Sequence, residues 1–167
     1  LITEIGGHGL AFVYDYPADG PTVMIRCELD ALPIQEVNEF DYHSRVNGIS
    51  HKCGHDGHMS IVAGLALWLR DQSFSGGRVV LFFQSAEETG KGAEAALRDE
   101  RFLALSPDYV FALHNIPGMP MHEVVLTPGL FSPTVQSLAI FLTGKEAHAS
   151  EPENGVNPAP EIAALIE

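Results

Sequence analysis

The chain has 167 residues, and its 22 Asp and Glu residues outnumber 9 Lys and Arg residues, which gives a formal charge of −13 with neutral histidines. So few cations on so acidic a chain exclude a phosphate-binding surface for nucleic acid and a cationic membrane anchor. The longest strongly apolar stretch, residues 61–69, is far shorter than the roughly 20 residues that span a bilayer. We therefore expect a soluble globular protein with neither a nucleic-acid nor a membrane partner.

Short strands and one long helix are expected in the first part of the chain. Alternating apolar residues predict a strand over 8–14, and a run of β-branched and apolar residues predicts another over 22–27. Between them, the segment 17–21 is rich in Pro and Gly and predicts a turn. Apolar residues then recur at helical spacing over 59–70, which predicts a largely buried helix.

The middle of the chain is typical of an α/β fold. An unbroken apolar run over 78–84 predicts a strand that is covered on both faces. A helix over 93–105 and a short strand over 109–113 are expected to follow. This order indicates the α/β class, with a mixed, largely parallel sheet flanked by helices.

The pattern changes after residue 132. A strand-like segment over 135–143 and a helix over 158–166 look like the opening of a second unit. We therefore divide the chain into a first domain over 1–132 and a second over 133–167.

Cysteine usage favours a reducing environment. The two cysteines, Cys27 and Cys53, are too few for a disulfide scaffold, and no signal peptide opens the sequence. We therefore expect a cytoplasmic protein.

The densest chemical signal is the segment 51–58, which places three histidines, Cys53 and Asp56 just before the buried helix. Thiolate and imidazole are ligands that suit Zn²⁺ and related ions. Cys53 and His55 are two residues apart, so in an extended segment both side chains project to the same side. A solvated polar loop, a helix cap that uses Asp56, and a nucleophilic Cys53 paired with a histidine stay open as alternatives.

Two further polar signals follow the expected strands. Glu87 and Glu88 come directly after the strand over 78–84, and His114 and Asn115 end the next one. Burying two neighbouring carboxylates costs free energy unless a cation offsets their charge. One Glu is therefore expected to coordinate a metal ion, and the other to face the water bound to that ion. The alternative is a charged surface loop. Because strand ends in an α/β sheet converge on one edge, these signals support one another.

Five blocks of sequence occur in the order found in one known family. They are RCELDALP at 26–33, CGHDGH at 53–58, QSAEE at 84–88, ALHNIPG at 112–118 and GKEAHASEP at 144–152. Together they resemble the amidohydrolase branch of the metallopeptidase M20 family, which includes hydrolases of N-acyl amino acids, hippurate and auxin conjugates.

The resemblance implies a role for each matching residue. It implies that the metal ligands are Cys53, His55, Glu88 and His114, and that the catalytic general base is Glu87. Glu28 and Asp30 are expected to orient ligands, although a surface role is the alternative for Glu28. Substrate contacts are expected from Asn115 and His148.

The resemblance also implies a fold, cofactors and partners. Residues 1–132 would be part of a zinc-exopeptidase-like catalytic domain, and residues 133–167 the start of a small α+β dimerisation or lid domain. One or two divalent ions (Zn, Mn, Ni or Co) per full-length subunit, an N-acyl amino acid substrate and a homodimer are implied. The alternatives are an M20-type dipeptidase, a carbamoyl-amino-acid hydrolase, or a metal-binding interaction module without catalysis.

Overall fold

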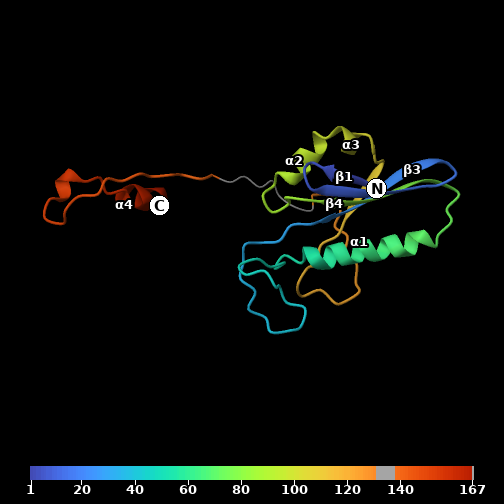
Figure 1. The fold of residues 1–167 in the computed structure, drawn as a ribbon, viewed down its shortest axis with the longest axis horizontal. Coiled ribbons are helices and arrows are strands. Elements are labelled where there is room, and N and C mark those ends of the chain that lie inside the picture. Colours follow the sequence, from blue (N-terminus) through green and yellow to red (C-terminus); the bar gives the residue numbers. More distant parts are fainter. Residues whose placement is uncertain (131–137, 167) are drawn as a thin grey trace. The chain divides into compact units, whose positions relative to one another are not determined.

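The structure is a computed structural model that describes residues 1–130 and 138–166 (Figure 1). The chain forms two compact units, Leu1–Val125 and Leu126–Glu167. The domain boundary expected between residues 132 and 133 lies in the segment 131–137, outside the described residues.

The first unit is built on a five-stranded sheet with the order β1-β2-β4-β3-β5. Strand β3 pairs in parallel with β4 and β5, whereas β2 pairs antiparallel with β1 and β4. The sheet is therefore mixed, which confirms the predicted α/β class. The strands are β1 (Ile2–Ile5), β2 (Gly9–Asp15), β3 (Ala18–Glu28), β4 (Gly76–Gln84) and β5 (Tyr109–Ala112).

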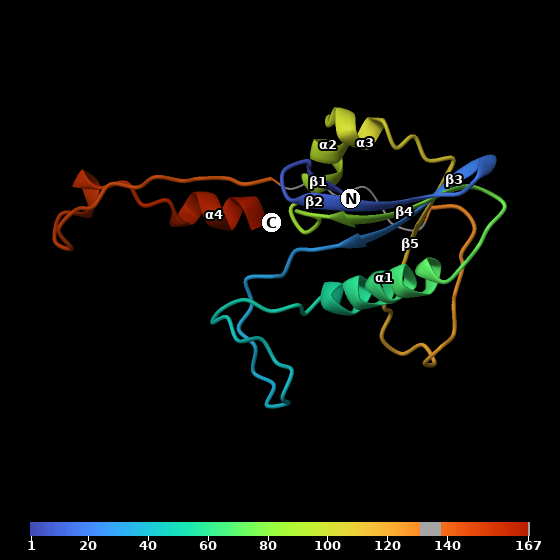
Figure 2. The same ribbon diagram turned by 45° about the vertical axis from the view of Figure 1, so that its right-hand side comes forward.

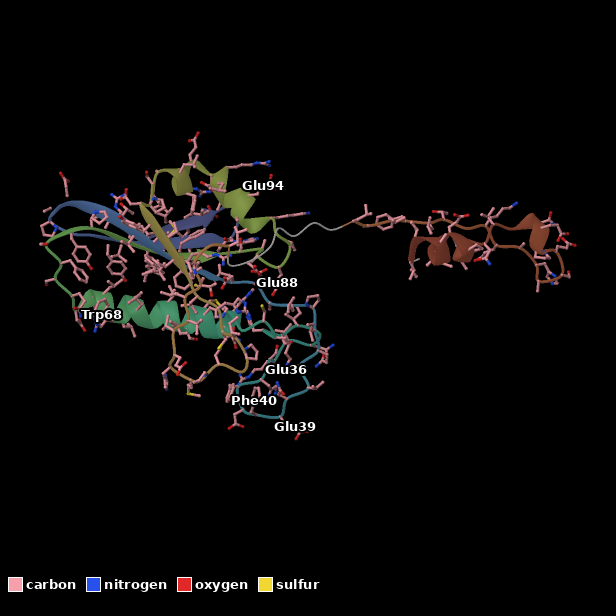
Figure 3. The ribbon with its side chains drawn as sticks, turned by 180° about the vertical axis from the view of Figure 1, so that it is seen from behind. Glu36, Glu39, Phe40, Trp68, Glu88 and Glu94 are labelled. Atoms are coloured by element: carbon pink, nitrogen blue, oxygen red, sulfur yellow. The ribbon has the colours of Figure 1, made fainter. Side chains whose placement is uncertain are left out.

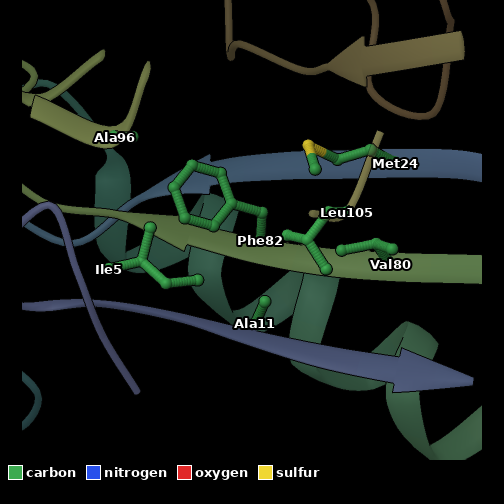
Figure 4. Packing of buried hydrophobic residues seen from close by; sticks show 7 residues of the cluster. All are labelled: Ile5, Ala11, Met24, Val80, Phe82, Ala96 and Leu105. Atoms are coloured by element: carbon green, nitrogen blue, oxygen red, sulfur yellow. The ribbon is translucent and has the colours of Figure 1, made fainter. Parts of the chain in front are cut away.

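Both faces of the sheet are covered, and β4 lies at its centre. Successive side chains of a strand point to opposite faces, so β4 supplies Val80 and Phe82 to one hydrophobic cluster and Leu81 and Phe83 to the other. The first cluster also takes side chains from β1, β2 and β3 (Figure 4). Figure 2 shows α1 (His55–Arg70) under one face, and α2 (Gly92–Leu97) and α3 (Glu100–Leu103) over the other. The unbroken apolar run of β4 is explained by this double burial.

Three predicted elements differ in detail from the structure. The helix expected over 93–105 is divided into α2 and α3, because Asp99 is extended and its side chain accepts the backbone N–H of Arg101 as the N-cap of α3. The turn expected over 17–21 is shorter, since β3 already begins at Ala18. Strand β1 was not predicted, and helix α1 begins four residues earlier than expected, at His55 rather than at residue 59. The expectation of a largely buried helix over 59–70 is wrong: within that range only Val62 and Leu69 are buried, because only one side of α1 packs on the sheet.

The second unit contains a 3-10 helix, η1 (Pro152–Asn154), and the helix α4 (Ala159–Ile166). The helix expected over 158–166 is thus confirmed. An isolated antiparallel bridge joins Lys145 and Val156. Of the strand expected over 135–143, residues 135–137 lie outside the described part, and 138–143 form no regular structure. No helix in the described ranges is both long and apolar enough to cross a membrane.

Candidate functional site

Four segments bring polar side chains to one edge of the sheet in the first unit. Because β3, β4 and β5 run parallel, their carboxyl ends lie at the same edge, where open α/β sheets carry their ligand sites. Glu28 and Gln84 end β3 and β4, and His114 follows β5 by two residues. The amino end of α1 lies at this edge too. In Figure 3, Glu88 is near that end of the helix and Trp68 marks the other end.

The predicted thiol and imidazole ligands come together. Candidate ligand atoms of Cys53, His55 and His114 all lie within 4.8 Å of one another. Cys53 Sγ is 3.4 Å from His114 Nε2, although these residues are 61 positions apart in the chain. Such a set of one sulfur and two nitrogens suits a zinc-like ion.

A second group of ligand atoms shares His55 with the first. His55, Glu87 and Glu88 also place ligand atoms within 4.8 Å of one another. The Nε2 atom of His55 is 3.6 Å from Oε2 of Glu87 and 3.8 Å from Oε1 of Glu88. The two neighbouring carboxylates therefore face the same imidazole, beside the Cys53–His114 pair.

The orientation of His55 leaves one nitrogen for a ligand. Its Nδ1 lies 2.8 Å from the backbone oxygen of Asp30, which is an acceptor, so Nδ1 carries the hydrogen. The other nitrogen, Nε2, is buried and has no hydrogen-bond partner among the described residues. A buried nitrogen that lacks a partner is costly, and a metal ion is a partner that fits its lone pair. The residues present thus fit a divalent cation.

Asp30 positions the carboxylate pair through its own side chain. Its Oδ1 accepts the backbone N–H of Glu87 at 3.0 Å, and its Oδ2 accepts that of Glu88 at 2.9 Å. Burial raises the pKa of Asp30, but the backbone N–H groups of Glu88, Glu87 and Asp30 itself, together with the nearby His55, bring the pKa below its ordinary value. The ionised Asp30 therefore fixes the loop that carries Glu87 and Glu88.

The negative charge around Cys53 favours a bound cation. Burial, together with Glu88, Glu87 and Glu28, raises the pKa of the Cys53 thiol to about 11. A divalent ion reverses this balance, because a coordinating thiol is deprotonated outright. The acidic groups that disfavour a free thiolate are thus the same groups that favour bound metal.

His58 is a residue of this site to which the sequence interpretation gave no role of its own. It is 1% exposed, and its Nδ1 lies 2.9 Å from Oε2 of Glu28, which is also buried. Its Nε2 accepts the backbone N–H of Asn115 at 3.2 Å, and the side-chain amide of Asn115 also lies against this nitrogen. The available signal was the spacing of three residues from His55, which places both rings on one helix face.

The residues expected to contact substrate lie in different units. Asn115 is at the sheet edge, and its side-chain amide lies against His58 and Gly54. His148 is exposed in the second unit, where its Nδ1 is 2.8 Å from the Ser150 hydroxyl. A substrate contact by either residue stays a prediction.

Comparisons with known proteins agree with this chemistry. The sequence model of Peptidase family M20/M25/M40 matches residues 24–166. An N-acetyl-L-cysteine deacetylase of Bacillus subtilis is 37% identical over 150 residues, which cover 89% of this chain and 36% of that protein. A hippurate hydrolase of Campylobacter jejuni is 34% identical over 163 residues, covering 98% of this chain and 42% of the hydrolase.

A solved structure has a similar fold. The crystal structure of the YXEP protein of Bacillus subtilis, described as a dinuclear metal-binding peptidase from the M20 family, matches with a TM-score of 0.62 and 36% identity. The match covers 68% of this chain and 31% of that one. The chain thus spans well under half the length of the curated relatives it matches.

Proposed function

Because the chain belongs to peptidase family M20/M25/M40, we propose that the protein is a metal-dependent amidohydrolase that cleaves the amide bond of N-acyl amino acids. The observation that carries the proposal is the meeting of Cys53, His55 and His114 beside two carboxylates at one sheet edge. The deacetylase and the hippurate hydrolase described above, whose names refer to N-acylated amino acids, support this substrate class.

The proposed ligands of the metal are Cys53, His55, Glu88 and His114. A mixed set of sulfur, nitrogen and oxygen is compatible with Zn, Mn, Ni or Co, and we propose one or two ions per full-length subunit. When bound by these residues, a divalent ion would supply water of lowered pKa, about 7 in place of 15.7, and polarisation of the substrate carbonyl.

Glu87 is the proposed general base. Its side chain faces His55 Nε2 and is 39% exposed, so solvent and substrate can reach it. In this role the carboxylate accepts a proton from the attacking water and passes it to the departing amino group. Asp30 keeps Glu87 in place by accepting its backbone N–H.

The substitution Glu87→Gln tests this assignment. The amide cannot accept a proton, so turnover is expected to fall by roughly 10²- to 10⁴-fold while metal content is unchanged. Elemental analysis and steady-state rates on the full-length protein are the measurements. If the variant instead loses metal and its remaining rate follows metal occupancy, the roles of Glu87 and Glu88 are exchanged.

A peptidase is the second candidate reaction, since the similar YXEP structure is described as a peptidase. Rates on hippurate, N-acetyl amino acids and indole-acyl amino acids, compared with rates on dipeptides and carbamoyl amino acids, separate the two classes. Faster hydrolysis of dipeptides would overturn the acyl-amino-acid proposal. Normal metal uptake without hydrolysis of any of these substrates would favour an interaction module instead.

We further propose a cytoplasmic homodimer. Both cysteines are free thiols, which suits a reducing compartment. Helix α4 exposes Ile162, Leu165 and Ile166, which supports a role for residues 133–167 in contacts between subunits. The mass of the full-length protein by light scattering tests the dimer, and a monomer would contradict it.

A further inference from the structure

His58 joins three segments of the site through its two ring nitrogens. Nδ1 contacts Glu28 at the end of β3, and Nε2 contacts the backbone N–H and the side-chain amide of Asn115, just after β5. His58 itself belongs to the first turns of α1. Because the ring is 1% exposed, water does not compete for these partners.

The contacts of His58 show that it holds neighbouring residues in place and does not itself bind a metal ion. Glu28, His55 and His58 do place ligand atoms within 4.8 Å of one another. Both nitrogens of His58, however, already have protein partners, and Glu28 forms an ion pair with Arg26. His55, in contrast, has a buried Nε2 without a partner. The ring that offers a lone pair is therefore His55.

The hydrogen bonds of His58 continue across the sheet edge. Arg26 Nε donates to the Gln84 side-chain oxygen at 3.1 Å, and Gln84 is the last residue of β4. We call this chain of contacts the strand-end network. It consists of Gln84, Arg26, Glu28, His58 and Asn115. It links the ends of all three parallel strands to α1. The chain after β4 and β5 carries proposed ligands and the base, and the chain after β3 carries Asp30, which positions the carboxylate pair.

We propose that His58 is a positioning residue that sets the distance between the Cys53–His55 segment and His114, an inference that rests on the proposed metal centre. Asn115 adjoins His114 in the chain, so holding its backbone N–H also holds the ligand beside it. At the other end, the turn of α1 that carries His58 starts next to Cys53. Without the ring, the two ligand-bearing segments lose the buried hydrogen bonds that join them, and the contact of Cys53 Sγ with His114 Nε2 is left without this support.

The experiment is a titration of the metal-free, full-length protein with Co²⁺, read by the absorption of the cobalt–thiolate bond to Cys53. His58→Leu is expected to weaken Co²⁺ binding by roughly 10- to 100-fold at unchanged stoichiometry, as is typical of partners that orient ligands. His58→Gln provides a donor and an acceptor for the same two neighbours, and is expected to recover most of the lost affinity.

His43→Leu is the matched control, because His43 is an exposed histidine whose ring contacts the backbone oxygen of Phe40. It is expected to bind Co²⁺ like the wild type. The melting temperature of each metal-free variant separates an effect on folding from an effect on positioning. Weaker Co²⁺ binding by a His58→Leu variant that melts like the wild type supports positioning. Restoration of the melting temperature by His58→Gln without restoration of affinity would overturn the proposal.

Three further results would also overturn it. Equal affinities of His58→Leu and the wild type would show that the ring positions nothing. Loss of one bound ion per chain in both His58 variants would make His58 a ligand. Absence of Co²⁺ binding by the wild type would refute the metal centre itself, and so the failure of the proposed function is distinguished from that of this inference.

Discussion

Asp30 accepts hydrogen bonds from different neighbours through its side-chain carboxylate and its backbone carbonyl. The carboxylate accepts the N–H groups of Glu87 and Glu88, while the carbonyl oxygen faces Nδ1 of His55. Asp30→Asn replaces one accepting oxygen by an NH₂ group, so one N–H loses its acceptor. Because hydrogen bonds to charged groups contribute about 1.5–3 kcal/mol, we expect a loss of that size in the free energy of unfolding. Urea denaturation of the metal-free protein at neutral pH measures it.

The pH dependence of this loss has a defined sign. Burial raises the pKa of Asp30, but the backbone N–H groups around its carboxylate and the nearby His55 together lower the pKa by more, so the folded-state pKa lies below the ordinary 3.8. A depressed pKa contributes stability above the unfolded-state value, and this stability is lost as the pH falls through the folded-state value. The difference between wild type and Asp30→Asn should therefore shrink below pH 3.8. A constant difference down to strong acid would contradict this account.

Cys53→Ser tests the thiolate ligand. A hydroxyl is a much poorer ligand, so metal affinity is expected to fall by more than the roughly 10- to 100-fold typical of changes around the ligands. Since the pKa of the metal-free thiol is raised to about 11, metal binding must release its proton. Wild-type affinity should therefore rise more steeply with pH than that of the variant. Unchanged metal content by elemental analysis would remove Cys53 from the ligand set.

The sequence predicted the positions of the site residues better than their contacts. Cys53, His55, Glu87 and His114 each adjoin the end of an apolar strand or the start of a helix, and the parallel pairing then brings them together. The bond between His58 and Asn115 joins residues 57 apart in the chain. This bond depends on how α1 packs on β3 and β4 and on the path of the chain after β5, which no local sequence pattern encodes.

Helix α1 starts at a glycine that no other residue replaces easily. Gly54 is the N-cap and has φ of +96°, a left-handed conformation that costs other residues about 1–2 kcal/mol. A Cβ there would also meet the Asn115 amide, with its Cγ at 2.9 Å. We therefore expect Gly54→Ala to weaken metal binding by separating Cys53 from His114, as well as to destabilise the fold.

The control for this prediction is in the same helix. A Cβ on Gly64 would meet no heavy atom within 4 Å, so Gly64→Ala should stabilise α1 by about 0.5–1 kcal/mol and leave metal affinity unchanged. Thermal unfolding and a metal titration of both variants measure the two effects. If Gly54→Ala bound metal like Gly64→Ala, the close approach of Asn115 would have no role in the site.

At the scale of helices and strands, the sequence predicted the regular elements well but did not predict where a helix is interrupted. The apolar run of β4 is strong because this strand is buried on both faces. The helical spacing in α1 comes from the side that packs on the sheet, with Val62 and Leu69 buried. The break between α2 and α3 depends on Asp99, whose carboxylate also accepts the N–H of Gly6 on the turn after β1. Since this contact is between residues 93 apart, the local helical pattern gave no sign of it.

The first unit exposes an apolar strand at one edge of its sheet. Strand β5 pairs with β3 and is the last strand in the sheet order, and Tyr109, Val110 and Phe111 are each more than half exposed. Such an edge is a template for pairing with another chain. We expect the 167-residue chain to associate as its concentration rises, and Val110→Lys to reduce this association.

Sedimentation velocity over a concentration series measures the effect. Val37→Lys is the matched control, because Val37 is an exposed valine outside the sheet and the change in charge is the same. If both lysine variants reduced association equally, net charge and not the strand edge would be responsible. A wild-type chain that stays monomeric throughout would refute the prediction.

The imidazole of His55 belongs to both groups of ligand atoms, and this limits how many metal ions the site can bind. The Nδ1 hydrogen of His55 points to the Asp30 carbonyl, which leaves a single lone pair on Nε2. One lone pair serves one ion, so the Cys53–His114 group and the Glu87–Glu88 group compete for the same nitrogen. Two ions held simultaneously would require the second to complete its coordination sphere without His55.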